Sequence, residues 1–417
     1  MKVLVIGSGA REHALAWALA AGDSRRKVFC GPGNAGTEAL AKNIPLEAEE
    51  PREVLRAVLE LGIDLVVVGP EGPLAAGVVD ALQEAGVAVF GPPRASAMLE
   101  CSKSFARSFQ ERRGIPCART ERFSDSAALK SFLDRRRGER VVLKKSGLAA
   151  GKGVLESDDP EELMAFGISV LAEDELLAEE YLVGRELSVF AVSDGREFIV
   201  LPACADHKKA GTGDTGPNTG GMGAICPVPY ADELAMDRIV REVVEPSYRG
   251  MADEGLSYRG VLFFGIMMTA DGPKLLEYNV RFGDPETQSL LPLLDDDFGE
   301  LCAHAVEGRL GGFVPRFSSK AACGVVVAAP GYPGPYPKGL DAELPGSEEG
   351  GLLFHASTSR ADNGRTRTGG GRCFTAVGLG ELWEAARDAA YSLASRVRFD
   401  GAWYRPDIGE KIFRAKN

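Results

Sequence analysis

The chain has 417 residues, of which 45% are hydrophobic and 26% charged, and this predicts a cytoplasmic protein of roughly two to four domains. Its formal net charge of −12 argues against nucleic acid as a main partner, because duplex binding usually requires a basic face. No apolar run has the length of a signal peptide or a membrane span, and the eight cysteines form no Cys-x-x-Cys pair, which disfavours a zinc site or a disulfide framework.

The first hundred residues alternate strand and helix patterns. Short apolar runs ending in glycine occur at residues 2–7, 27–31, 64–69 and 88–91, with helical patterns between them. This order is typical of a doubly wound parallel sheet. Because such sheets bind ligands at the carboxyl ends of their strands, we expect contacts with a ligand there.

Three of these strand ends carry polar side chains. The first reads Gly-Ser-Gly-Ala-Arg-Glu over residues 7–12, and Asn34 and Glu71 follow the next two ends. The first stretch is similar to a dinucleotide-binding fingerprint, but Glu12 replaces its third glycine, and Gly31-Pro32 stands where an acidic ribose ligand would be expected. A nicotinamide cofactor is therefore disfavoured. Tight turns alone would explain the glycines, but they would not explain the charged and amide side chains.

Residues 94–113 are predicted to form one helix. Met98, Cys101, Phe105 and Phe109 would share its apolar face, and a Gly-Ile-Pro sequence follows as a stop signal. Lys103 falls on the polar side, where, taken alone, it would be a solvated charge.

Residues 141–153 join a β-branched strand to a glycine-rich loop. Gly147, Gly151 and Gly153 would let backbone N–H groups approach an anion, and Lys144 and Lys152 would supply positive charge. The loop is not a Walker A motif, because too few residues separate its glycines and a glycine follows the second lysine. The loop is instead predicted to form the tip of a hairpin in a small α+β lid, and a flexible surface turn is the alternative.

The lid is expected to continue with a helix and a strand. Residues 159–162, Asp-Pro-Glu-Glu, indicate a helix start in which Glu162 closes a capping box, and the helix should end near residue 172. A strand is predicted over residues 176–182.

Residues 206–224 contain almost no apolar side chains and many glycines outside any regular period. This composition predicts a long functional loop. His207 alone would usually be structural, but beside Asp206 and Lys208 it could contact a substrate.

A second hairpin is predicted over residues 261–280. On its returning strand, Glu277, Asn279 and Arg281 would fall on one face, and the two oxygen ligands would lie about 7 Å apart along the chain. Such a pair suits Mg²⁺, which keeps water and phosphate oxygens as its other ligands. A polar strand face toward solvent is the alternative. A second charged loop follows at residues 282–288.

Four stretches together carry a resemblance to a known family. They are Gly-Leu-Ala-Ala-Gly-Lys-Gly from 147, Asp-His-Lys from 206, Thr-Gly-Pro-Asn-Thr-Gly-Gly-Met-Gly-Ala from 215 and Asn-Val-Arg-Phe-Gly-Asp-Pro-Glu-Thr-Gln from 279. The chain resembles the phosphoribosylamine-glycine ligase family of the ATP-grasp superfamily over nearly its whole length. It departs from the family pattern at Lys145-Ser146, where Ala-Asp is usual, and in a shorter segment before Glu179.

The resemblance implies an α/β fold with three domains. These would be an N-terminal doubly wound domain (1–102), an ATP-grasp domain (103–319) with its lid at about 120–187, and a C-terminal α+β domain (320–417), in which we expect strands at 324–329 and 372–377 and a helix at 381–398.

The resemblance also implies the site residues. For ATP they would be Lys103, Lys144, Gly147, Gly151, Lys152, Gly153, Glu179, Glu180, Tyr181, Leu182 and Glu186. The metal, Mg²⁺ or Mn²⁺, would be held by Glu277 and Asn279. The substrates would be held by Gly9, Arg11, Glu12, Asn34, Glu71, Asp206, His207, Lys208, Thr219, Gly220, Gly221, Met222, Arg281, Asp284, Pro285, Glu286 and Thr287. Arg281, Lys144 and Asp206 would be catalytic.

The implied reaction joins glycine to 5-phosphoribosylamine with ATP, through an acyl phosphate, in purine biosynthesis. The protein would act on small molecules as a monomer or weak homodimer. Other carboxylate-amine ligases stay open as an alternative. An NAD-dependent oxidoreductase is opposed by the missing third glycine, and a non-catalytic nucleotide sensor by the paired Glu277 and Asn279.

Overall fold

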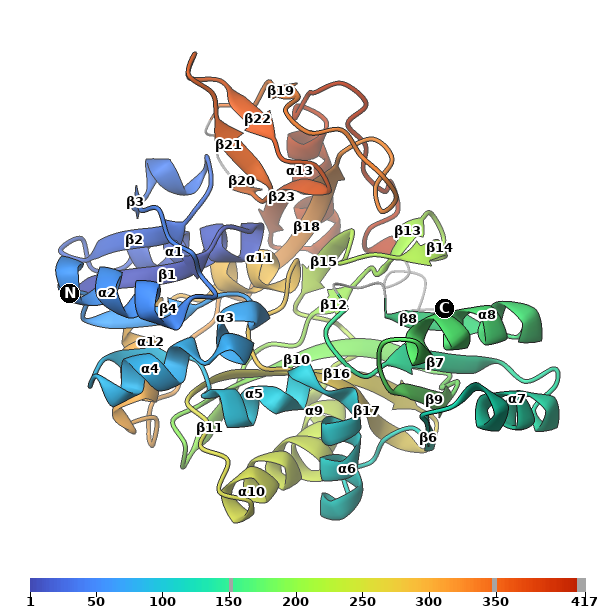
Figure 1. The fold of residues 1–417 in the computed structure, drawn as a ribbon. Helices are drawn as coiled ribbons and strands as arrows, with labels where there is room; N and C mark the ends of the chain where they lie inside the picture. Colours follow the sequence, from blue (N-terminus) through green and yellow to red (C-terminus); the bar gives the residue numbers. More distant parts are fainter. Residues whose placement is uncertain (150–152, 347–350, 411–417) are drawn as a thin grey trace.

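The protein is described by a computed structural model that covers residues 1–149, 153–346 and 351–410. An N-terminal sheet, a central sheet with a projecting lid and a C-terminal sheet surround the middle of the molecule (Figure 1). Within these described ranges, no helix is both long and apolar enough to cross a bilayer.

The N-terminal sheet is parallel, with the strand order β3-β2-β1-β4-β5. Its strands are β1 (Lys2–Gly7), β2 (Lys27–Pro32), β3 (Lys42–Asn43), β4 (Leu65–Val68) and β5 (Ala88–Phe90). Its helices are α1 (Ala10–Ala21), α2 (Pro51–Leu61), α3 (Glu71–Ala76) and α4 (Val78–Glu84), with a 3-10 turn at Thr37–Ala39. The predicted doubly wound sheet is confirmed. The two-residue strand β3 was not predicted, because it is too short to show a periodic pattern.

The helix expected over residues 94–113 is two helices, α5 (Arg94–Cys101) and α6 (Lys103–Arg113). The prediction of one helix was wrong, because Ser102 adopts an extended conformation and its hydroxyl accepts a hydrogen bond from Phe105 N, as the N-cap of α6. The break places Lys103 in the first turn of α6. Its side chain lines a pocket, so it is not the solvated charge that the helical pattern alone indicated.

The lid has a four-stranded sheet in the order β6-β9-β7-β8, covered by two helices (Figure 1). The strands are β6 (Thr120–Phe123), β7 (Val141–Lys145), β8 (Val154–Ser157) and β9 (Leu176–Glu180), and the helices are α7 (Ser126–Arg135) and α8 (Pro160–Leu171). The β7–β8 hairpin and the helix at 160 were predicted. The capping box was not correct in detail, because Glu162 accepts a hydrogen bond from Ser157 Oγ, and the Asp159 carboxylate caps the helix through Glu161 N. The lid buries its own hydrophobic cluster, so it is packed as a separate unit.

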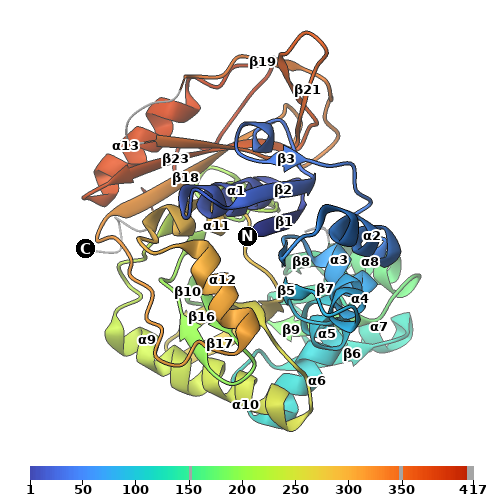
Figure 2. The same ribbon diagram turned by 90° about the vertical axis from the view of Figure 1, so that its left-hand side faces the viewer.

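The central sheet is antiparallel, in the order β11-β10-β16-β17, with the helices of residues 233–253 along one face (Figure 2). Its strands are β10 (Arg185–Ser193), β11 (Phe198–Val200), β16 (Gly260–Thr269) and β17 (Gly272–Asn279). The helices α9 (Glu233–Ile239) and α10 (Glu245–Asp253) are joined by a π-helical segment at Val240–Val244. The predicted hairpin at 261–280 is therefore the β16–β17 pair.

The stretch 206–224 is not one long loop, as its composition suggested. It contains β12 (Ala205–Asp206), a hairpin of β13 (Lys209–Gly211) and β14 (Thr215–Asn218), and the start of β15 (Gly223–Cys226). Composition failed here because glycine-rich strands lack the alternating apolar side chains from which strands are predicted.

The C-terminal sheet has the order β12-β15-β18-β23-β20, and its strands come from two parts of the chain. β18 (Ala321–Ala328), β20 (Gly351–His355) and β23 (Arg372–Gly380) follow residue 320, whereas β12 and β15 precede it. Three short strands form a separate sheet, β19 (Asp341–Ala342), β21 (Thr358–Arg360) and β22 (Thr366–Thr368). The helices α11 (Glu286–Leu290), with a 3-10 turn at Leu291–Leu293, and α12 (Phe298–Glu307) precede residue 320, and α13 (Trp383–Ala394) follows it. The expected boundary at 320 therefore crosses a continuous sheet.

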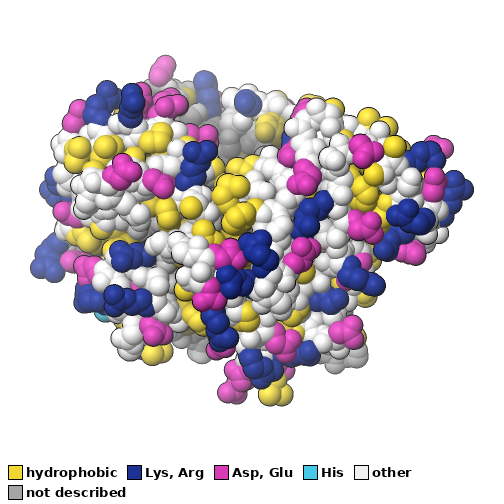
Figure 3. Space-filling model, turned by 60° about the horizontal axis from the view of Figure 1, so that its bottom comes forward, with side chains coloured by type: hydrophobic (Ala, Val, Ile, Leu, Met, Phe, Trp, Pro, Cys, Tyr) yellow, Lys and Arg dark blue, Asp and Glu magenta, His cyan; other side chains and the backbone are white. Residues whose placement is uncertain are grey.

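Charged side chains of both signs are interspersed on the face of the molecule drawn in Figure 3. Because the whole chain carries a net charge of −12, an anionic ligand needs positive charge that is concentrated locally. The pocket described next supplies it.

Candidate active site

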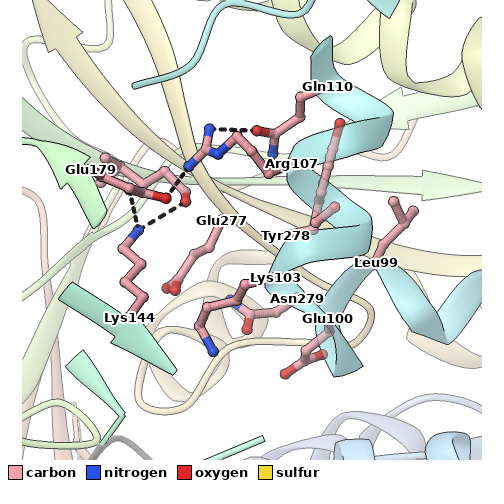
Figure 4. A pocket seen from close by; sticks show the side chains of 12 residues that line it. Leu99, Glu100, Lys103, Arg107, Gln110, Lys144, Glu179, Glu277, Tyr278 and Asn279 are labelled. Carbon is pink, nitrogen blue, oxygen red and sulfur yellow. Dashed lines mark hydrogen bonds and ion pairs between the residues drawn. The ribbon is translucent and has the colours of Figure 1, made fainter. Parts of the chain in front are cut away.

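A pocket lies between the lid, α5–α6 and β17 (Figure 4). It is lined by Leu99, Glu100, Lys103, Ala106, Arg107, Gln110, Lys144, Glu179, Leu276, Glu277, Tyr278 and Asn279. Five of the residues expected for ATP or metal, Lys103, Lys144, Glu179, Glu277 and Asn279, thus line one pocket, although they come from four separate elements.

Glu179 is the buried centre of an ion-pair network in this pocket. Its Oε2 lies 2.8 Å from Lys144 Nζ, and its Oε1 accepts a hydrogen bond from Arg107, whose other nitrogen donates to Gln110 (Figure 4). Burial alone would raise the pKa of Glu179, but Lys144 and Arg107 hold it below its usual value. Glu179 therefore acts as a carboxylate that orients two cations and does not itself need to touch a nucleotide.

Glu277 and Asn279 are two residues apart on β17, so their side chains lie on the same face of the strand, and both face the pocket (Figure 4). Burial would raise the pKa of Glu277, yet Lys208, Lys144, Lys103 and Arg281 lower it to about 2. Glu277 is thus a carboxylate at neutral pH, and Lys208 Nζ lies 3.7 Å from it. A carboxylate and an amide oxygen on one side of the pocket fit a hard divalent cation, whose other ligands would be phosphate and water. Asn279 Oδ1 also accepts a hydrogen bond from Arg281 Nη2 at 3.2 Å, which a bound cation would replace.

Arg281 follows the metal pair and lies between two carboxylates. Its Nη2 is 2.7 Å from Glu100 Oε1, and its Nε is 3.4 Å from Glu71 Oε2. The second oxygen of Glu100 accepts a hydrogen bond from Val280 N at 2.7 Å. Burial raises the pKa of Glu100, whereas Arg281 opposes that shift. Arg281 is therefore fixed at the junction of the N-terminal domain and β17.

Glu100 and Arg107 were missed by the sequence analysis. Each is a charged residue within a helical pattern, where solvent exposure is the usual expectation. Their exposed fractions are 8% and 3%, and neighbouring charges in the sequence, such as Lys103 and Glu111, favoured an exposed helix face. Only the fold brings Glu100 to Arg281 and Arg107 to Glu179.

Lys208 lies beside one residue of the expected ATP site, Glu186, and one of the expected metal site, Glu277. It forms an ion pair with Glu186, the expected ribose ligand, and faces Glu277. Burial would lower the pKa of Lys208, but Glu186, Glu277 and Asp206 raise it above its usual value. Lys208 therefore stays cationic at the edge of the pocket.

The glycine loop lies only partly within the described residues. Gly147 N donates to Asp174 Oδ2 at 2.8 Å, and Gly153 O accepts from Lys145 N at 2.8 Å. The expected ATP ligands Gly151 and Lys152 lie outside the described residues.

Several expected binding side chains are occupied elsewhere. Glu180 pairs with Arg119 and Lys274, Tyr181 stacks under Arg140, and Leu182 is half-buried. The backbone of Glu179 and Glu180 is paired with β6 and β7, so any backbone contact with a nucleotide from this stretch would come from residues 181–182.

His207 does not reach the pocket. It is fully buried, and its Nε2 accepts a hydrogen bond from Gly409 N at 3.0 Å. Met222 is likewise fully buried in the core. These positions support the shape of the site and do not offer their side chains to a substrate.

The N-terminal residues form a buried turn beside the second charged loop. Glu12 accepts from Gly9 N and from Arg11, and Arg11 Nη1 donates to Phe282 O at 3.0 Å. Asn34 donates to Ser8 O at 2.8 Å, and its Oδ1 accepts from Gly36 N at 2.8 Å. Arg11 and Glu12 therefore tie the end of β1 to the 281–287 loop.

The turn at 219–222 packs directly against the loop at 284–287. Gly221 has φ of +105°, and a Cβ placed there would lie 2.4 Å from Pro285 Cδ. Thr219 Oγ1 donates to Lys208 O at 2.8 Å. In the same region Glu286 accepts from Ser188 Oγ at 2.8 Å, and Thr287 is fully buried. The two predicted substrate segments are thus one packed unit, adjoining Asp206 through Gly221.

The two α+β lobes that close on this lysine-rich pocket, with a carboxylate and an amide on the strand below it, define an ATP-grasp protein. The chain belongs to the phosphoribosylglycinamide synthetase family, because models of its N domain, ATP-grasp (A) domain and C domain match residues 1–100, 101–287 and 322–411.

Relatives along the whole chain agree with this assignment. A phosphoribosylamine–glycine ligase of Ralstonia nicotianae is 42% identical, with 99% of this chain and 100% of that protein covered, and one of Rhizobium meliloti is 42% identical with 98% of both covered. The crystal structure of phosphoribosylamine–glycine ligase from Thermotoga maritima is 36% identical and superposes with a TM-score of 0.83, over 98% of this chain and 100% of that one. The biotin carboxylase domain of a Hydrogenobacter thermophilus 2-oxoglutarate carboxylase, 16% identical with a TM-score of 0.72 over 100% of this chain and 94% of that one, shares the fold alone.

Proposed function

We propose that the protein is an ATP-dependent ligase that joins glycine to 5-phosphoribosylamine and releases ADP and phosphate, in purine biosynthesis. The observation that carries the proposal is the convergence of Lys103, Lys144, Glu277 and Asn279 in one pocket, with Arg281 at its junction with the substrate loops. Cations and a metal-type donor pair are what transfer of a phosphoryl group requires.

The reaction needs no nucleophile from the protein. A carboxylate oxygen of glycine attacks the γ-phosphorus of ATP, the bond from that phosphorus to the β–γ bridging oxygen breaks, and ADP leaves. The amine of phosphoribosylamine then attacks the carbonyl carbon of the acyl phosphate, phosphate leaves, and the nitrogen loses a proton as the amide forms.

In the first step, negative charge moves toward the ADP oxygens. Lys103 and Lys144 lie on the walls of the pocket where this charge would develop. A cation bound by Glu277 and Asn279 would neutralise phosphate charge when present. The protein would therefore act through positioning and charge neutralisation.

The second step takes place just beyond the end of β17, where Arg281 follows the metal pair. Arg281, held by Glu100 and Glu71, is placed to stabilise the acyl phosphate, and Asp206 lies beside the packed substrate segments. We propose Arg281, Lys144 and Asp206 as the catalytic residues. We further propose Lys103, Gly147, Gly151, Lys152, Gly153, residues 179–182 and Glu186 for ATP, and residues of the 9–12, 34, 71, 206–208, 219–222 and 284–287 segments for the substrates.

We also propose Mg²⁺, or Mn²⁺ in its place, as the metal, a cytoplasmic location, and a monomer or weak homodimer as the working form. The proposed domains are 1–102, 103–319 and 320–417. Metal choice is tested by turnover with each ion as the only divalent cation present.

The deciding experiment measures ADP release from ATP while glycine and phosphoribosylamine are omitted in turn. We expect ADP to form at the full rate only when both are present. Full-rate release with a different acid or amine would favour another carboxylate-amine ligase, and release that needs neither substrate would contradict the proposal.

A further inference from the structure

Arg372, the first residue of β23 in the C-terminal sheet, reaches both predicted substrate segments. Its Nη1 donates to Gly220 O at 2.6 Å, to Asp284 O at 2.8 Å and to Gly221 O at 3.4 Å. Its Nη2 donates to Asp284 Oδ2 at 3.0 Å. One guanidinium group therefore joins two segments that are more than sixty residues apart in the sequence.

The charge of Arg372 is matched to this position. The side chain is 21% exposed. Burial would lower the pKa of Arg372, but Asp284, together with nearby acidic groups, raises it above its usual value. The planar fork of an arginine can serve acceptors in two directions at once, which the single ammonium of a lysine cannot do with the same geometry.

The surroundings of the guanidinium leave little freedom. A Cβ placed at Gly220 would lie 3.0 Å from Arg372 Cζ, so the turn approaches the guanidinium as closely as glycine allows. Gly220 N also donates to Tyr332 Oη at 3.1 Å, a second contact from the C-terminal part of the chain.

Arg372 also fixes the direction of the Asp284 side chain. Asp284 Oδ2 receives Arg372, and Oδ1 accepts from Gln288 Nε2 at 2.7 Å. By contrast, none of the residues that line the ATP pocket is a hydrogen-bond partner of Arg372 in the described structure. The hydrogen bonds that Arg372 makes in the described structure therefore go to the substrate segments and not to the nucleotide pocket.

We propose that Arg372 is a positioning residue for the glycine and phosphoribosylamine end of the site. It holds the 219–222 turn and the 284–287 loop in register, so that the C-terminal domain determines substrate binding but not ATP binding. This inference rests on the proposed function for its substrates, and its structural half can be tested without any turnover.

The first test is hydrogen exchange on the intact protein without substrates. In Arg372→Gln and Arg372→Lys, we expect amide exchange to increase at least tenfold in both 219–222 and 284–287, and to stay unchanged in β17. A matched control is Arg387→Gln, because Arg387 is also in the C-terminal domain, is 25% exposed, and donates to Ile408 O and Pro406 O but to neither of the two segments. Faster exchange in only one segment, or equal changes in the Arg387 variant, would overturn the clamp.

The second test is steady-state kinetics of the same variants and of Arg372→Ala. We expect the KM for glycine or phosphoribosylamine to rise at least tenfold and the KM for ATP to change less than twofold, with partial rescue of Arg372→Ala by added guanidinium ion. A similar rise in all three KM values, or full recovery by lysine, would refute the positioning role. Failure of the proposed function would appear separately, as a wild-type protein that does not need both substrates for ADP release.

Discussion

Lys144 Nζ and Glu179 Oε2 lie 2.8 Å apart, and Glu179 also binds Arg107 on its other oxygen. The carboxylate is therefore shared between Lys144, which lines the pocket, and Arg107, which belongs to α6. Its negative charge offsets two cations that would otherwise repel each other.

We expect Glu179→Gln to lower the free energy of unfolding by about 3 kcal/mol, because it leaves Arg107 and Lys144 without their buried counter-charge. Urea unfolding measures this change. The matched control is Glu173→Gln, since Glu173 pairs with Lys145 but is 72% exposed, and a pair of that kind contributes less than about 1 kcal/mol. Equal losses in the two variants would show that Glu179 has no special structural role.

The metal pair can be tested by Glu277→Gln, which keeps the shape of the side chain but removes its charge. We expect turnover to fall on the order of a hundredfold, since each ~1.4 kcal/mol of lost transition-state stabilisation is tenfold, and excess Mg²⁺ should recover part of it. Glu381→Gln is a suitable control, because that carboxylate is 74% exposed. Normal turnover of a folded Glu277 variant at low Mg²⁺ would remove this residue from the site.

The histidine pair between α1 and β20 predicts a pH dependence of stability. Burial, and then His355, lowers the pKa of His13 to about 3, and burial, and then Arg360, lowers the pKa of His355 to about 4. A histidine in the unfolded chain has a pKa of ~6.5, so below that pH the unfolded chain binds protons that the folded chain does not bind. Above about pH 6.5 the two histidines therefore cost the folded state nothing. As the pH drops toward 4, the free energy of unfolding decreases.

The measurement is the urea midpoint from pH 7.5 to 4.5. His13→Gln should flatten the fall over this range, although it also weakens the contact in which His355 N donates to His13 Nδ1. His304→Gln is the control, because His304 lies outside this pair: its Nδ1 contacts Arg309 O and its ring stacks on Phe313. An unchanged slope in the His13 variant would assign the pH dependence to other groups.

The contact between the substrate segments predicts a cost for Gly221→Ala. The new Cβ would meet Pro285 and would require an unfavourable positive φ, which together should cost about 2–5 kcal/mol and raise the KM for the substrates. Gly213→Ala isolates the effect of φ, because Gly213 has φ of +72° but nothing within 4 Å of its Cβ position. Thermal unfolding and kinetics of both variants separate close contact from strain, and similar results would argue against tight packing at Pro285.

The sequence predicts local features of this protein well where one element carries the whole signal. Glycines at 7, 31, 69 and 91 stand at or beside the ends of four N-terminal strands, and the pairing of β7 with β8 follows from a loop between two apolar runs. Alternation alone brings Glu277 and Asn279 to one face of β17.

Prediction failed where a residue's environment comes from a distant part of the chain. Glu100 is buried because Arg281 and Val280 N reach it, and Arg372 is engaged by segments around residues 220 and 284. The burial of His207 has a related cause, because the backbone of Gly409, more than two hundred residues further along the chain, contacts it. A single sequence contains no local signal for such long-range pairs.

The pairing of β15 with β18 has a consequence for the modular history of the chain. Ile225 lies opposite Cys323, so one edge of β15 is covered only by a strand from the last hundred residues of the chain. A fragment that stopped at residue 319 would present β15 as an open edge, and open edges recruit strands from other chains. The C-terminal unit shares its sheet with the strands around residues 205–226. An exchange of this unit between relatives would therefore have to include those strands.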